Sequence, residues 1–348
     1  MKKLAVALAG YGSGGKIYNA PIISGVEGLS ITHILTSNPK NVEAAKLDFP
    51  TAAVVSSYEE ILNNPNVDLV IILLPNHLHF EYAKRALEAG KHVVVEKPIT
   101  PTTAEADELI SLAKEKNLIL SVNHNRRYDS DVRTVQKLLK EKKLGDIVEY
   151  ETHFDRFRPQ IKPGWKEQED IAGSGIVYDL GSHLIDQALT LFGKPEAVYA
   201  DIRIQRKMAK VPDNFEILLL YPHLKVTLKA GMLVNGKGPT ISIFGTRGSF
   251  TKFGVDLQEE SLKQGKTPQN DPEWGQEPQE IWGQINTIEE QGRYSSEKGD
   301  YRILYQNVYQ AILGNQELEV TAQQARDVIR VIELAYESNT RRCEMPFS

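Results

Sequence analysis

The chain has 348 residues, of which 41% are hydrophobic and 25% charged, and its formal net charge is −5. This length exceeds what one hydrophobic core usually serves, and the composition is typical of a globular protein rather than a disordered one. The net negative charge does not favour binding to nucleic acid or to an anionic membrane. The sequence contains no apolar run of about 20 residues, so we predict no membrane-spanning segment. We therefore expect two domains and a small-molecule partner.

The cysteine content limits the chemistry further. The single cysteine, Cys343, excludes an intrachain disulfide and a cysteine-rich metal site. Other ligands at a credible metal spacing are not evident, so we expect no bound metal. The apolar segment Leu4–Ala9 is too short for the core of a signal peptide and ends in glycines. These features predict a cytoplasmic protein in a reducing compartment.

A glycine-rich turn follows this first apolar segment. Leu4–Ala9 lacks polar alternation, as expected of a strand buried on both faces of a parallel sheet. The turn contains G-x-G-x-x-G at Gly10, Gly12 and Gly15, and a helical stretch and a second apolar strand, Ile31–Leu35, come after it. Glycine there permits a tight turn, close approach of a pyrophosphate and close packing of helix on strand. The pattern predicts a dinucleotide-binding unit rather than a merely flexible loop.

The residues after the second strand indicate which cofactor binds. An NAD site usually has an acidic residue about 20 residues after the glycines, where it holds the ribose hydroxyls. This chain has no acid between Ile31 and Val42 and presents Ser37, Asn38 and Lys40 instead. Hydroxyl, amide and ammonium groups bind a 2′-phosphate, which a carboxylate would repel. We expect NADP, with NAD as the alternative, since Lys40 also fits a solvated helix start.

Strands and helices continue to alternate as far as residue 123. Apolar strands are predicted at Val67–Leu74, His92–Val95 and Leu118–Asn123. Helices are predicted at Phe80–Ala89 and Thr103–Lys116. This alternation is typical of a doubly wound parallel sheet. We therefore predict an α/β protein whose residues 1–124 form a Rossmann domain.

Polar side chains gather where these strands end. In open parallel sheets, ligands bind beyond the carboxyl ends of the strands. Asn76 and His79 follow one strand, Glu96 and Lys97 the next, and Asn123–Arg127 the last. A lysine at such a position, held by the proline that follows it, can polarise a substrate hydroxyl or carbonyl. A surface lysine after a strand is the equally simple alternative.

The periodicity changes after residue 125. Helices are predicted at Ser130–Lys142 and Ala322–Ser338. Segments with one polar face predict strands at Val148–Phe157, Ala197–Gln205, Phe215–Tyr221, Lys225–Leu233, Ile241–Gly245 and Ser249–Phe253. Few helices separate them, so residues 125–348 are predicted to form an α+β domain with a large, mostly antiparallel open sheet. Such a sheet favours a homodimer or homotetramer, and Gln258–Trp282 is expected to be an extended loop or arm.

One segment of this second domain carries candidate acid–base chemistry. Apolar residues recur at helical spacing from Asp179 onward, which places Asp179 and His183 on one helix face. An aspartate can orient an imidazole, whose ordinary pKa near 6.5 suits proton exchange at neutral pH. The alternative is that Asp179 caps the helix and His183 is a buried histidine with satisfied hydrogen bonds.

Taken together, these residues resemble the Gfo/Idh/MocA family of glucose–fructose oxidoreductase, inositol dehydrogenase and the rhizopine-catabolism proteins. The resemblance covers essentially the whole chain. It rests on Gly10–Gly15, Pro75–His79, Val94–Pro98, Asn125–Arg127 and Asp179–His183. The combination of Glu-Lys-Pro with Asp-x-x-x-His about 80 residues later is specific. Residues 153–159 and Trp165 resemble the NADP-preferring branch that includes scyllo-inositol dehydrogenase.

The resemblance implies a role for each matching position. Lys97 lies against the nicotinamide and the reacting hydroxyl, and His183 is the general acid/base. Asp179 orients His183 or binds a neighbouring hydroxyl, and Glu96 steadies the site beside Lys97. The residues expected to contact the cofactor are Gly10, Gly12, Ser13, Gly15, Ser37, Asn38, Lys40, Pro75, Asn76, His79, Glu96, Lys97, Arg126 and Trp165. Those expected to contact the substrate are Lys97, Arg156, Tyr178, Asp179 and His183.

These implications lead to one expected function and two alternatives. We expect hydride transfer between NADP(H) and a secondary alcohol or ketone of a cyclic polyol or sugar, scyllo-inositol being the first candidate. The first alternative keeps the fold but prefers NAD, or retains its cofactor, and acts on another sugar or a glycoside. The second is a non-catalytic sensor of the nicotinamide redox state, which would be free to lose Lys97, Asp179 and His183.

Overall fold

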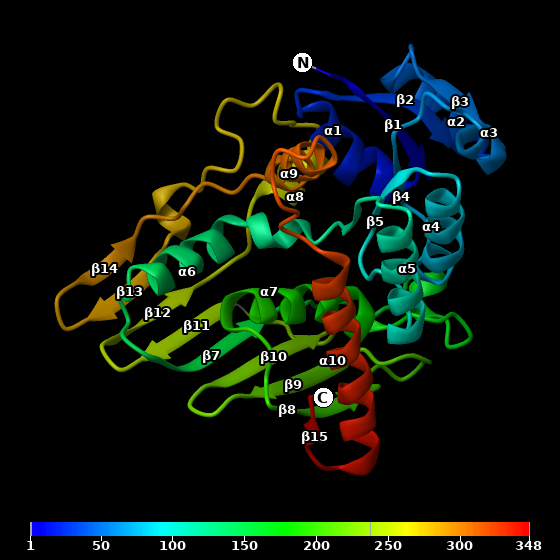
Figure 1. Cartoon of the computed structure of the whole chain (residues 1–348). Helices are drawn as coiled ribbons and strands as arrows, with labels where there is room; N and C mark the ends of the chain where they lie inside the picture. Colours follow the sequence, from blue (N-terminus) through cyan, green and yellow to red (C-terminus); the bar gives the residue numbers. More distant parts are fainter. Residues whose placement is uncertain (1, 237, 348) are drawn as a thin grey trace. The chain divides into compact units, whose positions relative to one another are not determined.

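The computed structural model describes residues 2–236 and 238–347 (Figure 1), and these form two compact units. The first unit comprises the chain up to Asn125, together with Gln258–Trp274 and Asp300–Arg326. The second comprises Arg126–Leu257, Gly275–Gly299 and the chain from Asp327 onward. The chain thus crosses between the units more often than the single predicted boundary after residue 124 implies.

The first unit is built on a six-stranded parallel sheet in the order β3-β2-β1-β4-β5-β6. Its strands are β1 (Leu4–Ala9), β2 (Leu29–Leu35), β3 (Ala53–Val55), β4 (Leu69–Ile72), β5 (His92–Val95) and β6 (Leu120–Val122). The central strands are almost entirely buried, which explains their unbroken apolar runs. This order is that of a Rossmann dinucleotide fold, and the predicted fold of this part is confirmed.

Helices connect these strands, and two of them have typical capping residues at one end. They are η1 (Gly14–Asn19), α1 (Ala20–Ser24), α2 (Pro39–Asp48), α3 (Tyr58–Leu62), η2 (Asn76–Leu78), α4 (His79–Glu88) and α5 (Thr103–Glu115). Thr102 caps α5 with a capping box: its hydroxyl accepts from the backbone N–H of Glu105, and the Glu105 carboxylate accepts from the backbone N–H of Thr102. Gly90 follows α4 with a φ of 75°, a conformation that favours glycine.

The second unit contains a nine-stranded sheet in the order β14-β13-β12-β11-β7-β10-β9-β8-β15. Its strands are β7 (Ile147–His153), β8 (Ala197–Arg203), β9 (Asn214–Leu220), β10 (Lys225–Gly231), β11 (Ile241–Gly245), β12 (Gly248–Lys252), β13 (Gly283–Thr287), β14 (Gln291–Tyr294) and β15 (Met345–Pro346). Every pair is antiparallel except β7 with β10. The predicted open, mostly antiparallel sheet is therefore confirmed.

Two helices, α6 (Ser130–Lys140) and α7 (Ser182–Phe192), cover one face of this sheet in Figure 1. Tyr150 of β7 is fully buried against Phe192 of α7, with ring centroids 5.2 Å apart. Strand residues on this face, such as Leu219 and Val226, are also fully buried. The alternation of buried and half-exposed side chains along β8 and β9 follows from this one-sided cover.

Two later segments of the chain return to the first unit. The segment Gln258–Trp274, expected to be part of an extended loop, contains α8 (Gln258–Lys263) and the buried side chain of Trp274. The Gln258 side chain accepts a hydrogen bond from the backbone N–H of Tyr301, which precedes α9 (Arg302–Ile312). The prediction of a loop was wrong for Gln258–Lys263, which is helical, whereas residues 264–278 contain no regular helix or strand.

The last long helix, α10 (Ala322–Arg341), begins where the closing helix was predicted. In the part of the chain that the structure describes, no helix has the length and apolar character needed to cross a bilayer.

A cluster of charged side chains is buried inside the second unit. Asp131, Asp256, Glu277 and Lys252 are each at most 6% exposed. The Lys252 ammonium lies 3.2 Å from Glu277, and the backbone N–H of Ser130 donates to Asp256 at 2.7 Å. Burial first, and then the neighbouring carboxylates, raise the pKa of Asp131 to about 7. The cluster ties α6 to β12 and to the segment before β13.

Candidate active site

The glycine turn after β1 has the geometry of a phosphate-binding loop. Gly10 has a φ of 119°, and a Cβ there would lie 2.7 Å from the carbonyl oxygen of Leu73. A Cβ on Gly15 would lie 2.6 Å from the carbonyl oxygen of Gly10. At Gly12, by contrast, a Cβ would meet no protein atom within 4 Å. The loop thus packs tightly where the fold needs it and is open where a pyrophosphate would approach, so its residues fit a dinucleotide.

The end of β2 carries no carboxylate. Ser37 is exposed two residues after the strand, and Lys40 is exposed in the first turn of α2. The Asn38 side chain caps the N-terminus of α2, since its oxygen accepts hydrogen bonds from the backbone N–H groups of Lys40 at 3.0 Å and Asn41 at 3.4 Å. That oxygen is used by the helix, which leaves the Ser37 hydroxyl and the Lys40 ammonium as the groups best suited to a 2′-phosphate.

His79 lies inside the protein after β4. Its side chain is fully buried, with Nδ1 2.7 Å from the carbonyl oxygen of Pro98 and Nε2 2.8 Å from that of Leu74. Burial lowers its pKa, which favours the neutral ring, and a neutral ring donates to only one of these two carbonyl oxygens. The histidine therefore joins the end of β4 to the turn that holds Lys97. Its contact with the cofactor stays a prediction, as do those of Pro75 and the buried Asn76.

Glu96 is the centre of a buried network beside Lys97. Its Oε1 accepts from the side-chain amides of Asn19 and Asn123, each at 2.8 Å, and its Oε2 accepts from the backbone N–H of Lys97 at 3.1 Å. The Tyr305 hydroxyl donates to Asn19 at 2.5 Å. Asn19 and Tyr305 are absent from the sequence-predicted site. Asn19 looks like an ordinary helix residue, and Tyr305 is far from Glu96 along the chain. No sequence pattern around either residue therefore indicates a functional site.

The second unit places Asp179 and His183 on consecutive helical turns, in η5 (Val177–Gly181) and α7. The His183 side chain is 7% exposed and stacks on Phe154 at a centroid distance of 6.5 Å. Asp179 forms ion pairs with Lys166 at 2.5 Å and Arg156 at 3.9 Å. Lys166 was not among the predicted site residues, because an exposed lysine in a polar segment has no distinguishing pattern.

Two arginines of η3 (Asn125–Tyr128) lie beside α7 and Phe154. Arg127 forms a buried bidentate pair with Asp186 of α7, at 2.8 and 2.6 Å. Arg126 pairs with Asp129 at 3.0 Å and lies over the Phe154 ring, 4.7 Å from its centroid. Because a guanidinium group stays protonated, Arg126 places a fixed positive charge over the Phe154 ring. The contact of Arg126 with the cofactor stays a prediction.

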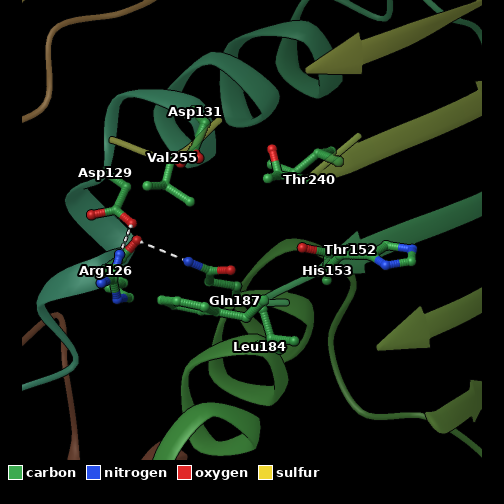
Figure 2. Close-up of a pocket in the computed structure, with 11 residues that line it drawn as sticks. Arg126, Asp129, Asp131, Thr152, His153, Leu184, Gln187, Thr240 and Val255 are labelled. Carbon is green, nitrogen blue, oxygen red and sulfur yellow. Dashed lines mark hydrogen bonds and ion pairs between the residues drawn. The ribbon is translucent and has the colours of Figure 1, made fainter. Parts of the chain in front are cut away.

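A small cavity of about 20 Å³ lies beside Arg126, and Figure 2 shows the side chains that line it. Gln187 donates to the backbone oxygen of Arg126 there, at 3.2 Å. The residues that line the cavity are Arg126, Asp129, Asp131, Thr152, His153, Phe154, Leu184, Gln187, Thr240, Ile241 and Val255. A space of this size holds a water molecule and not a sugar. The cavity is therefore a feature of the packing.

The remaining predicted residues also belong to the second unit. Trp165 begins η4 (Trp165–Glu167), and Tyr178 stacks on Tyr336 with ring centroids 6.2 Å apart. Arg156 lies over Phe154, 5.1 Å from the ring centroid. The structure thus groups Arg156, Asp179 and His183 in one unit, and His79, Glu96 and Lys97 in the other. The cooperation of Lys97 with His183 stays a prediction.

Comparisons with known proteins agree with this arrangement. Residues 4–124 match the oxidoreductase family model with an NAD-binding Rossmann fold, and residues 136–346 match the C-terminal alpha/beta domain of the same Gfo/Idh/MocA family. The chain belongs to the Gfo/Idh/MocA oxidoreductase family. This membership makes it a nicotinamide-dependent dehydrogenase acting on CH–OH donors.

Several relatives are similar over their full length. The chain is 40% identical over 343 residues to scyllo-inositol 2-dehydrogenase (NADP(+)) IolW of Bacillus subtilis strain 168, covering 97% of this chain and 94% of the relative. It is 43% identical to the oxidoreductase YdgJ of Escherichia coli K12, covering 98% of each chain. The solved structure of the Bacillus subtilis oxidoreductase yvaA has a TM-score of 0.96 and 38% identity, covering 100% of this chain and 99% of that one.

Proposed function

We propose that this dehydrogenase transfers a hydride between NADP(H) and a secondary alcohol or ketone of a cyclic polyol, with scyllo-inositol as the first candidate. The observation that carries the proposal is the full-length similarity to an enzyme named as an NADP-dependent scyllo-inositol 2-dehydrogenase. The absence of a carboxylate at the end of β2 supports the choice of NADP. The single cysteine supports a reducing, cytoplasmic location.

The residues have distinct tasks under this proposal. The glycine loop and the start of η1 would hold the pyrophosphate of the cofactor, whose nicotinamide would supply the hydride acceptor. The Lys97 ammonium donates a hydrogen bond to the reacting oxygen and stabilises the negative charge that develops there. A ring nitrogen of His183 takes the hydroxyl proton, because an unassisted alkoxide is too costly at neutral pH. Asp179 accepts a hydrogen bond from a neighbouring hydroxyl.

The test is a panel of inositols, aldoses and anhydro-sugars, each assayed with NADP and with NAD by the absorbance of the reduced cofactor. We expect turnover of scyllo-inositol, with NADP preferred over NAD by at least tenfold in kcat/KM. Turnover of an aldose alone would contradict the polyol assignment. If no compound of the panel is turned over although the cofactor binds tightly, the result would support a retained-cofactor enzyme or a sensor and overturn the proposal.

An added negative charge tests the choice of cofactor directly. In Ser37→Asp, a carboxylate at the end of β2 should repel the 2′-phosphate, since like charges about 4 Å apart repel by roughly 1–4 kcal/mol near a surface. We expect the ratio of kcat/KM for NADP over NAD to fall at least tenfold. Ser37→Asn is the matched control, because it has nearly the same shape without the charge. Equal ratios in both variants would place the 2′-phosphate elsewhere.

We also propose that the chain forms a homodimer or homotetramer through the sheet face opposite α7. The strand register places Tyr199, Leu218 and Thr227 in one row across that face. Phe244, which lies opposite Glu149 on the same face, is 44% exposed. Light scattering should give a mass of two or four chains, and Phe244→Glu should shift it toward one.

A further inference from the structure

The segment before η5, residues 166–175, is held in the second unit by several hydrogen bonds. The guanidinium group of Arg206 is buried and donates to both carboxylate oxygens of Glu167, at 3.0 and 2.9 Å, and to Asp213 at 2.8 Å. The backbone N–H of Gly175 donates to the carbonyl oxygen of Lys166 at 2.9 Å. Nη2 donates to both oxygens of Glu167 and Nε donates to Asp213, so one buried guanidinium group holds two carboxylates in place. The backbone at Lys166 therefore has a defined place.

From this place, the Lys166 side chain reaches Asp179. Its Nζ lies 2.5 Å from Oδ1, while Oδ2 lies 3.9 Å from Nη1 of Arg156. The Lys166 side chain is 51% exposed, whereas that of Asp179 is 19% exposed. One carboxylate thus faces two cations, with the lysine approaching from the solvent side. The two ion pairs hold the carboxylate in one orientation and offset part of its negative charge.

We propose that Lys166 is a positioning residue of the dehydrogenase site: it orients the Asp179 carboxylate and offsets its charge, so that the His183 ring stays neutral and ready to accept a proton. The inference rests on the proposed function, because it assigns His183 the proton transfer. It adds a residue that is neither a predicted cofactor contact nor a predicted substrate contact.

The physical reason is the position of Asp179 one helical turn before His183. Residues four apart on a helix are neighbours, and a carboxylate there stabilises a protonated imidazole. A cation on that carboxylate weakens this effect. Without Lys166, more of the negative charge of Asp179 would act on His183, and the ring would hold its proton to a higher pH.

Other charges of the second unit that lie near His183 include one paired carboxylate and two arginines. Asp186, on the following turn of α7, is neutralised by Arg127. Arg126 and Arg156 lie over the Phe154 ring that stacks on His183, and both favour the neutral imidazole. Lys166 is thus the exposed member of this group of cations, and it can be replaced with the least disturbance of packing.

The first experiment is the pH profile of kcat/KM for Lys166→Met. We expect the acidic limb to move up by about half to one pH unit, so that kcat/KM at pH 6 falls roughly three- to tenfold and recovers above pH 8. Lys166→Arg should restore the wild-type profile because it keeps the charge. Lys162→Met is the matched control, since Lys162 is an exposed lysine of the same segment. A profile of Lys166→Met equal to that of Lys162→Met would overturn the proposal.

A second experiment does not depend on turnover. The His183 ring is labelled at Cε1 with ¹³C, assigned by its absence in His183→Ala, and titrated by NMR without substrate. We expect its midpoint to rise in Lys166→Met and to return in Lys166→Arg. An unchanged midpoint overturns the role of Lys166 even if the enzyme oxidises scyllo-inositol. A shifted midpoint in a protein that turns over no polyol supports the role of Lys166 and contradicts only the proposed function.

Discussion

Replacement of Lys97 by methionine, or of His183 by alanine, is expected to lower kcat for scyllo-inositol oxidation by about 10²–10⁴-fold. Methionine keeps the length of the lysine side chain but cannot donate a hydrogen bond to the reacting oxygen. Alanine at position 183 removes the proton acceptor and leaves the helix intact. Both losses act on the transition state, so kcat should fall far more than KM rises. Steady-state kinetics with saturating NADP measure the effect.

Cofactor binding separates a catalytic role from a structural one. The glycine loop and the end of β2 are unaltered in both variants, so NADPH titrations followed by fluorescence should give Kd values within about threefold of the wild type. Lys116→Met, which alters an exposed lysine at the end of α5, is the matched control and should retain full activity. Near-normal kcat in either Lys97→Met or His183→Ala would refute the assigned roles.

Replacement of Asp131 by asparagine is expected to stabilise the protein at alkaline pH. The pKa of Asp131 is raised from 3.8 in the unfolded chain to about 7 in the folded protein, chiefly by burial. Between these values the unfolded chain releases a proton that the folded protein keeps, so the free energy of unfolding falls as the pH rises from about 4 to 7. Above pH 7 this group costs roughly 4 kcal/mol of stability.

Asparagine has nearly the same shape and stays neutral, so it removes this cost. Its side-chain oxygen can still accept the hydrogen bond from the backbone N–H of Val132, which lies at 2.7 Å in the wild type. We expect Asp131→Asn to raise Tm by several degrees at pH 8 and by little at pH 4.5. Asp170→Asn, at an exposed position, is the matched control. Equal destabilisation by Asp131→Asn at both pH values would contradict this account.

Features that depend on neighbours in the chain could be predicted from the sequence. The strand Leu4–Ala9 and the glycines after it were predicted correctly, because a strand buried on both faces needs an unbroken apolar run and the turn has to bring backbone atoms close together. The helix that carries Asp179 and His183 was predicted from the spacing of its apolar residues. Local steric demands leave few alternatives at such positions.

Features that depend on distant partners could not be predicted. Glu96 was predicted as a site residue, but its partner Asn19, and the Tyr305 hydroxyl that completes the network, follow from contacts across 77 and 286 residues. The segment Gln258–Trp274 returns to the first unit through such contacts as well. Polar residues like these carry no periodicity, since their energetics come from single hydrogen bonds rather than from a repeated apolar face.

By itself, the sequence determined that this protein has a Rossmann domain with a dinucleotide loop, followed by an open-sheet domain with an Asp–His helix. Short-range sterics and hydrophobic periodicity dictate those features. Only the tertiary structure decided that Asp179 is paired with Lys166 and Arg156, that His79 is buried between two carbonyl oxygens, and that Asp131 shares its site with two other carboxylates. Charge and hydrogen-bonding energies depend on distance and burial, and these exist only once the chain has folded.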